Sequence, residues 1–207
     1  MVQRSDIAEI RPPTGLKTFF DGKTARLWSL GDPAILNGRL LGIISARQSD
    51  SDLALKSSQL LKQLVSLKDV CFVGGWHSPL EEEALRFVLA QGASLVFCVA
   101  KALDRFTPSA EVERRLSEGK ALLLTHCSPK AKRITRAASL RRNELILELA
   151  KALLVLSAPE GSGSLKLAQL ALSRGKHVLS PEHPMNKELL ASGALPAAFE
   201  NIQTCLR

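Results

Sequence analysis

Nearly continuous apolar runs recur along the chain, and each is followed by small or polar residues and then by a helical period. The runs predicted to be strands span residues 40–45, 69–73, 93–100, 121–125, 152–158 and 176–180. Their lack of in–out alternation is typical of strands that are covered on both faces. Helices are predicted over 53–67, 80–91, 109–118, 140–151 and 165–174. This alternation predicts an α/β fold with an open, mostly parallel sheet and helices on both faces.

The chain divides into three parts by composition. Residues 1–25 mix proline and glycine (Pro12, Pro13, Gly15, Gly22) with polar residues, and we expect an irregular N-terminal lead-in there. Residues 26–198 are expected to form the α/β domain, and residues 199–207 a C-terminal tail. No run reaches the ~18 apolar residues of a membrane span, and the N-terminus has no apolar leader segment. We therefore expect a cytoplasmic protein with no membrane partner.

The net charge indicates the class of partner, and the cysteine spacing indicates which kinds of cross-link or metal site are absent from the prediction. A net charge of +8 and a pI near 9.6 favour an anionic partner, nucleic acid or a nucleotide, although a basic protein without such a ligand is the alternative. Residues 130–142 carry six basic and no acidic side chains. The cysteines are far apart and form no C-x-x-C pair, so neither a disulfide framework nor a metal site is predicted. Cys71 and Cys98, inside apolar runs, are expected to be core thiols in a reducing compartment.

The loops that follow the predicted strands are where ligands of such folds bind, near the point where strand order reverses. Four of them carry candidate groups: residues 45–47, 74–77, 101–106 and 161–164. The last one, Gly-Ser-Gly-Ser, leads into a helix whose first N–H groups lack partners, which favours an anion site. Turn geometry alone explains such a loop equally well. It is not a Walker loop, and Lys166 stands where a dinucleotide-binding loop has its third glycine.

Further candidate ligand-binding residues are identified by their position at the ends of predicted strands and helices. Arg141, Arg142 and Asn143 are predicted to open a helix, where cations are disfavoured, so the arginine pair is expected to bind an anion. Arg47 is either a phosphate ligand or a solvated loop charge. Gly74 and Gly75 either let a ligand approach the backbone or make a tight turn. The histidines, serines and the run Glu81 to Glu83 form no catalytic constellation, so no catalytic residue, metal or cofactor is expected.

Taken together, these segments resemble the DNA-processing protein A (DprA, or Smf) family over roughly residues 26–198. The family's strand followed by G-S-R is similar to GIISAR at 42–47, and its S-G-x-A-x-G-I-D segment to residues 74–81. Its G-L-D-x-x-Y-P turn resembles 102–108, its R-N-R-I-I helix start 142–146, its S-G-S-L loop 162–165, and its ending 178–196. Gly74, Pro79, Glu81 and Glu144 depart from these motifs. The chain resembles a divergent, minimal member of this Rossmann-like superfamily.

The resemblance implies a protein without enzymatic activity that binds single-stranded DNA in a basic pocket at the C-terminal edge of the sheet. It also implies a homodimer that loads a RecA-type recombinase during DNA uptake and recombination. Arg47 and Arg142 would contact phosphates, Gly163 and Ser164 would donate hydrogen bonds, and Lys101 or Arg105 would line the rim. Trp76 and Phe106 would stack on bases or else belong to the core. The full candidate set is Ser45, Arg47, Gly74, Gly75, Lys101, Arg105, Arg141, Arg142, Asn143, Gly161, Ser162, Gly163 and Ser164.

A second resemblance leads to a different class. The lysine-decarboxylase-like phosphoribohydrolases carry a P-G-G-x-G-T-x-x-E loop, which residues 159–167 resemble up to its acidic end. Lys166 and Leu167 stand where catalytic glutamates are expected, which argues against hydrolysis of a nucleoside monophosphate. A domain that senses a mononucleotide without cleaving it is the related alternative.

Overall fold

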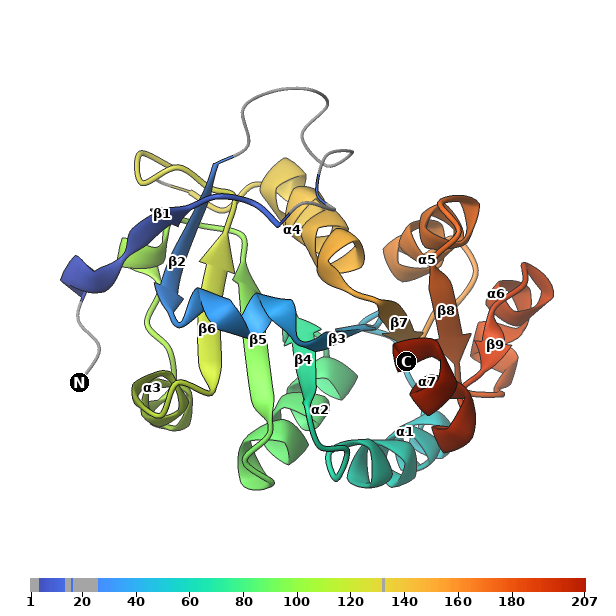
Figure 1. Cartoon of the computed structure of the whole chain (residues 1–207). Coiled ribbons are helices and arrows are strands. Elements are labelled where there is room, and N and C mark those ends of the chain that lie inside the picture. Colours follow the sequence, from blue (N-terminus) through green and yellow to red (C-terminus); the bar gives the residue numbers. More distant parts are fainter. Residues whose placement is uncertain (1–3, 14–15, 17–25, 132) are drawn as a thin grey trace.

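One sheet organises the chain (Figure 1). The computed structural model describes residues 4–13, 16, 26–131 and 133–207. Within them, nine strands follow the order β1-β2-β6-β5-β4-β3-β7-β8-β9. β2 pairs antiparallel with both β1 and β6, and every neighbouring pair from β6 to β9 is parallel. The strands are β1 (Ala8–Ile10), β2 (Leu27–Gly31), β3 (Arg39–Ile44), β4 (Val70–Gly74), β5 (Ser94–Val99), β6 (Ala121–Thr125), β7 (Ala152–Val155), β8 (His177–Ser180) and β9 (Leu195–Pro196).

Helices cover both faces of the sheet. They are α1 (Ser51–Leu64), α2 (Pro79–Ala90), α3 (Ala110–Ser117), α4 (Arg136–Leu149), α5 (Gly163–Ser173), α6 (Lys187–Ala191) and α7 (Phe199–Leu206). Residues of α1, α2, α3 and α7 share one buried apolar cluster with the sheet, and residues of α4, α5 and α6 share the other (Figure 1). The predicted α/β fold with an open, mostly parallel sheet is therefore confirmed. No helix in the described ranges has the length and apolar character that a membrane crossing requires.

The strand order places a switch point at β3. From β3 the chain proceeds outward through β4, β5 and β6, and later returns to the other side of β3 with β7, β8 and β9. The loops after β3 and β7 therefore leave neighbouring parallel strands for helices on opposite faces of the sheet. Such a point is where open α/β sheets bind ligands, at the carboxyl ends of the strands.

Both ends of the chain contribute more to the domain than the sequence pattern predicted. Most of the lead-in, including Gly15 and Gly22, lies outside the described residues, but β1 joins the sheet by pairing with β2. Within residues 199–207, expected to be a tail, Phe199–Leu206 form helix α7. Its residues Ile202, Cys205 and Leu206 are buried in the cluster that contains α1. Two helical turns are too few for a clear sequence period, and burial against the sheet stabilises them.

Helix α4 begins earlier than predicted. Thr135 caps it by accepting a hydrogen bond from the N–H of Ala138 at 3.0 Å, so the helix starts at Arg136 rather than at Leu140. Arg141 and Arg142 consequently lie in the second turn. The argument that they crowd a helix N-terminus is wrong, because the helix dipole acts mainly within the first turn.

Candidate anion-binding site

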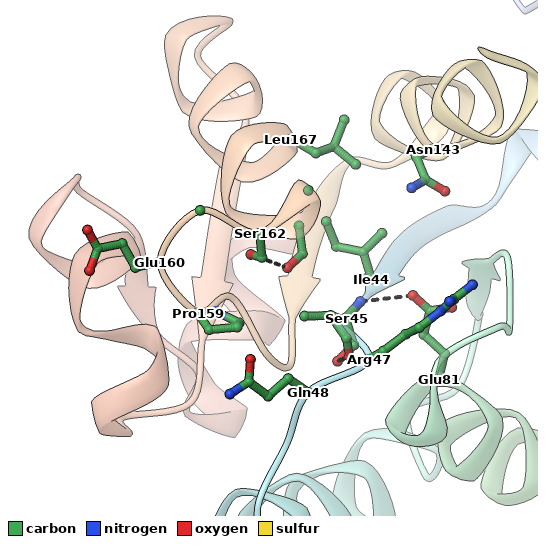
Figure 2. A pocket seen from close by; sticks show the side chains of 14 residues that line it. Ile44, Ser45, Arg47, Gln48, Glu81, Asn143, Pro159, Glu160, Ser162 and Leu167 are labelled. Carbon is green, nitrogen blue, oxygen red and sulfur yellow. Dashed lines mark hydrogen bonds between the residues drawn. The ribbon is translucent and has the colours of Figure 1, made fainter. Parts of the chain in front are cut away.

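A pocket of about 500 Å³ opens at the switch point, between the loops that follow β3 and β7 (Figure 2). We call it the switch-point pocket. It is lined by Ile44, Ser45, Ala46, Arg47, Gln48, Glu81, Asn143, Pro159, Glu160, Gly161, Ser162, Gly163, Ser164 and Leu167. Seven of the candidate residues thus meet in one place: Ser45, Arg47, Asn143, Gly161, Ser162, Gly163 and Ser164.

The small-residue loop presents backbone amides to this pocket. Gly161 has φ +73°, a left-handed conformation that glycine adopts without strain. The hydroxyls of the loop are engaged internally: Ser162 Oγ accepts from the N–H of Leu165 at 3.1 Å, and Ser164 Oγ donates to Ser157 O at 2.8 Å. Gly163 and Ser164 are the first two residues of α5, so their N–H groups have no acceptor within the helix. The amides, rather than the hydroxyls, are therefore the donors open to an anion.

Long-range hydrogen bonds hold the loop after β7 against the segments that follow β8 and β3. Asn186 is fully buried, and its Oδ1 accepts from the N–H of Ala158 at 2.8 Å while its Nδ2 donates to Leu156 O and Pro181 O. The N–H of Ala46 donates to Ser157 O at 2.8 Å. Sequence reasoning missed Asn186, because a positioning asparagine that acts across 28 residues leaves no local signal.

Arg47 is the exposed cation of the pocket. Within the part of the chain that the structure describes, its guanidinium has no hydrogen-bond or ion-pair partner. In Figure 2 its side chain extends from the loop after β3 toward the side of the pocket that Glu81 lines. An arginine held in a pocket without an internal acceptor has its full donor set available to a phosphate.

A second pocket of about 470 Å³ adjoins the first, and we call it the β5 pocket. Ser45, Arg47, Glu81 and Asn143 line both pockets. The β5 pocket also has His77, Ser78, Val99, Ala100, Lys101, Phe106, Ile134, Ser139 and Arg142 in its wall. It therefore combines basic groups with an apolar floor, and the shared residues make one extended site of the two pockets.

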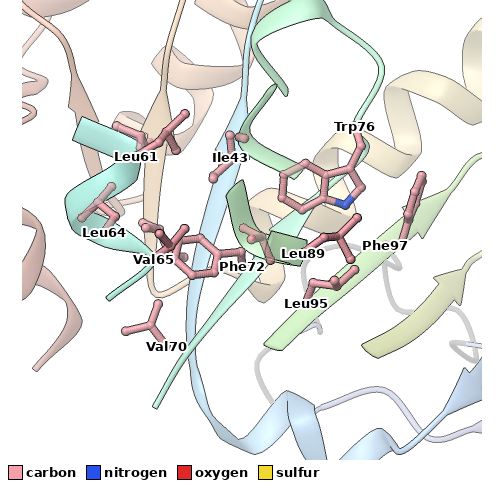
Figure 3. Close-up of a cluster of buried hydrophobic side chains, with 14 of the residues drawn as sticks. Ile43, Leu61, Leu64, Val65, Val70, Phe72, Trp76, Leu89, Leu95 and Phe97 are labelled. Carbon is pink, nitrogen blue, oxygen red and sulfur yellow. The ribbon is translucent and has the colours of Figure 1, made fainter. Parts of the chain in front are cut away.

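Aromatic side chains divide between the core and the β5 pocket. Trp76 is only 3% exposed and lies among apolar side chains that include Leu89 and Phe97 (Figure 3). Base stacking by Trp76 is therefore excluded in this structure. Phe106 is half-buried: its ring lies 5.0 Å from that of Phe97, and Lys101 Nζ lies 5.3 Å from its centroid. Phe106 thus packs on the core while still forming part of the pocket wall.

Arg142 lies beneath the β5 pocket, 6% exposed. Its Nη1 donates to Gly75 O and Cys98 O at 3.3 Å each, and its Nε donates to Asn143 Oδ1 at 2.7 Å. A Cβ on Gly75 would come within 2.2 Å of that Nη1, and a Cβ on Gly74 within 2.7 Å of the Trp76 ring. The two glycines therefore make room for the protein's own side chains, and not for a ligand.

Glu81 is the site residue whose role the sequence did not indicate. It is 8% exposed; its Oε1 accepts from the N–H of Ser45 at 2.8 Å, and its Oε2 from those of His77 at 2.8 Å and Ser78 at 3.4 Å. With Ser78, which accepts from the N–H of Glu81, it also forms the capping box of α2. Burial raises the pKa of Glu81, while the amide hydrogen bonds and Arg142 act in the opposite direction.

The charges around the site also act on His77. Desolvation lowers the pKa of His77 to about 4, and the positive charges of Arg142, Arg47 and Lys101 act in the same direction. His77 is therefore neutral at pH 7. The pKa of His77 is thus sensitive to the positive charge of the extended site.

Two of the candidate arginines lie outside both pockets. Arg105 is exposed, with its Nε 4.0 Å from Asp104 Oδ2, in the short 3-10 helix Leu103–Arg105. Arg141 is ion-paired with Glu144 at 3.1 Å on α4. The structure thus gathers Arg47, Lys101 and Arg142, and leaves these two aside.

An open, mostly parallel sheet with a small-residue loop, a helix N-terminus and basic side chains at its switch point defines a Rossmann-like protein with a candidate anion-binding site. The sequence profile of the family described as DNA recombination-mediator protein A matches residues 8–197. The chain belongs to this family.

Solved structures share the fold. DNA processing protein A (DprA) from Streptococcus pneumoniae is 19% identical, with a TM-score of 0.80 over 96% of this chain and 74% of that one. The DprA of Helicobacter pylori, described for its single-stranded DNA binding mode, is 19% identical, with a TM-score of 0.78 over 99% and 96%. The molybdenum cofactor binding protein of Rippkaea orientalis is 16% identical, with a TM-score of 0.58 over 82% and 98%. No curated protein matches the chain in sequence.

Proposed function

We propose that this protein binds single-stranded DNA across the switch-point pocket and the β5 pocket. The observation that carries the proposal is Arg47, an exposed guanidinium without an internal partner that lines both pockets. On one side of it lie the first amides of α5, and on the other lies Lys101. Family membership and the net charge of +8 support the same ligand class.

Each part of the site has a role in this proposal. Arg47 binds a backbone phosphate, and the N–H groups of Gly163 and Ser164 bind a second phosphate oxygen or the next phosphate. Lys101 adds charge at the rim of the β5 pocket. Arg142 contributes its charge from beneath and holds Asn143 and the Gly75 carbonyl in place. The apolar wall formed by Val99, Phe106 and Ile134 accommodates a base.

Binding of labelled oligothymidylate, followed by fluorescence anisotropy at low salt, tests the proposal. Arg47→Ala is expected to weaken binding by about ten-fold and to reduce the slope of log K against log salt by about one. Lys120→Ala is the control, because Lys120 is an exposed cation before β6, at the opposite end of the parallel strands. Absence of binding by the wild type, or equal effects of the two variants, would overturn the proposal.

The competing hypothesis is that the ligand is a mononucleotide. Calorimetry with nucleoside monophosphates distinguishes this hypothesis from binding of single-stranded DNA. Tight mononucleotide binding without oligonucleotide binding would favour a sensor. Hydrolysis is disfavoured by the pocket itself: Leu167 presents an apolar side chain where the hydrolase loop has an acidic one, and Lys166 is exposed.

The proposal also includes two partners. The family's description as a recombination mediator supports the loading of a RecA-type recombinase onto the bound strand, and the resemblance stated for the sequence supports a homodimer. Light scattering after size-exclusion chromatography tests the homodimer. Recombinase loading is tested by whether the protein speeds assembly of a RecA-type filament on DNA coated with single-strand-binding protein, with Arg47→Ala as the inactive comparison.

A further inference from the structure

A carboxylate occupies the backbone amides that a Rossmann-like site usually offers to its ligand. The N–H groups of Ser45 and His77 directly follow β3 and β4, and both donate to Glu81 at 2.8 Å. Glu81 lines both pockets, so an anion bound beside Arg47 lies next to its negative charge. All of the hydrogen bonds that the structure records to this carboxylate come from N–H donors, an arrangement that suits the ionised form.

The second carboxylate of the switch-point pocket is placed differently. Glu160 is exposed, and Figure 2 shows it directed away from Arg47, on the far side of the loop after β7. Glu81 is buried and shares its position with Arg47 in both pockets. Of these two acidic side chains, Glu81 is the one that lines both pockets together with Arg47.

We propose that Glu81 determines specificity for phosphodiesters over terminal phosphomonoesters. This inference rests on the proposed function, since it concerns which phosphate the same site accepts. A phosphodiester carries one negative charge, whereas a phosphomonoester carries about 1.5 to 2 at pH 7. A fixed carboxylate repels the more highly charged group more strongly, and burial reduces screening by solvent. The cations of the site attract an internucleotide phosphate, while Glu81 selectively weakens binding of free mononucleotides and 5′-phosphate ends.

Two small probes with the same nucleoside differ in the charge of their phosphate and by one methyl group. Thymidine 5′-phosphate is a monoester, and its methyl ester is a diester with the same nucleoside. Each competes against labelled oligothymidylate, and the quantity measured is the ratio of their inhibition constants. In the wild type we expect the methyl ester to compete at least as well as the monoester. In Glu81→Gln the ratio shifts by about ten-fold in favour of the monoester, because one nearby charge is removed.

Two matched variants separate charge from structure. Glu82→Gln removes an exposed carboxylate from the next position of α2 and is expected to leave the ratio unchanged. Glu81→Asp keeps the charge and is expected to retain the wild-type preference. Thermal unfolding shows whether Glu81→Gln folds, since its single amide oxygen cannot satisfy all of the N–H donors.

Each outcome bears on the inference separately from the proposed function. If the wild type binds oligothymidylate but Glu81→Gln leaves the ratio within two-fold, the inference fails and DNA binding stands. If Glu81→Gln does not fold, the wild type decides: a monoester that competes ten-fold better than its methyl ester overturns the inference. If the wild type binds no oligonucleotide, the proposed function itself fails.

Discussion

The loops after β7 and β4 both place small residues between a parallel strand and a helix, yet they do opposite things. After β7, Gly163 has open space where a Cβ would lie. After β4, the space beside Gly75 is filled by the guanidinium of Arg142, and that beside Gly74 by the ring of Trp76. One loop leaves room for a ligand, and the other is packed by the protein itself.

This difference shows that glycines at a strand end serve one of two purposes. The missing side chain leaves space either for a ligand or for a side chain from a distant part of the sequence. Arg142 lies 67 positions from Gly75, so no local pattern distinguishes the two cases. The buried arginine still serves the site indirectly, because it supports the β5 pocket from below.

The largest expected effect is on stability, and it distinguishes the two loops when one methyl group is added to each. Gly75→Ala displaces Arg142 from two carbonyl acceptors, and we expect it to lower the free energy of unfolding by about 1–3 kcal/mol. Gly163→Ala meets nothing within 4 Å and is expected to change it by less than about 0.5 kcal/mol. Urea denaturation followed by circular dichroism measures both.

The same pair behaves differently in DNA binding. Gly163→Ala, although stable, places a methyl group beside the first amides of α5, and its affinity for oligothymidylate is expected to fall several-fold. A Gly163→Ala protein with unchanged affinity would show that the anion does not bind at this helix end. A Gly75→Ala protein as stable as the wild type would show that Arg142 moves aside without cost.

The titration of His77, which directly follows Trp76 in the loop after β4, tests whether an anion binds at the extended site. In the free protein its pKa of about 4 lies below the ordinary 6.5, so the unfolded chain binds the additional proton and stability is lost as pH falls from 6.5 to 4. A bound phosphate offsets the charges of Arg47, Lys101 and Arg142, and the pKa of His77 is expected to rise toward 6.5. Proton uptake on binding means that affinity increases as pH falls through this window. NMR titration of the His77 ring, with and without oligothymidylate, measures the shift, and an unmoved pKa would place the DNA elsewhere.

The smallest effect concerns Trp76. Trp76→Phe keeps an aromatic ring in the core and removes no recorded hydrogen bond, since the indole Nε1 has no partner among the described residues. We expect the affinity for oligothymidylate to stay within about two-fold. Because a stacked base contributes ~1–3 kcal/mol, a loss of ten-fold or more would restore the stacking role that the structure argues against.

Much of the fold was predictable because its signals are local. Continuous apolar runs such as those of β3 and β5 indicate strands covered on both faces. Asp50 and Ser78, which precede α1 and α2, each cap their helix by accepting a hydrogen bond from the N–H three residues further on. The loop after β7 and Arg47 were identified in the same way. The start of α4 was missed, because the basic composition of residues 130–142 concealed the cap at Thr135.

The sequence by itself determined the class of fold, the family and the edge of the sheet at which the candidate site lies. Only the tertiary structure decided which basic residues meet there, separating Arg47 and Lys101 from Arg105 and Arg141. It alone placed Glu81 among the amides of two different loops. The physical reason is that strand and helix formation follow from neighbours along the chain, whereas charges and hydrogen-bond partners are matched across dozens of residues by the packing of the sheet.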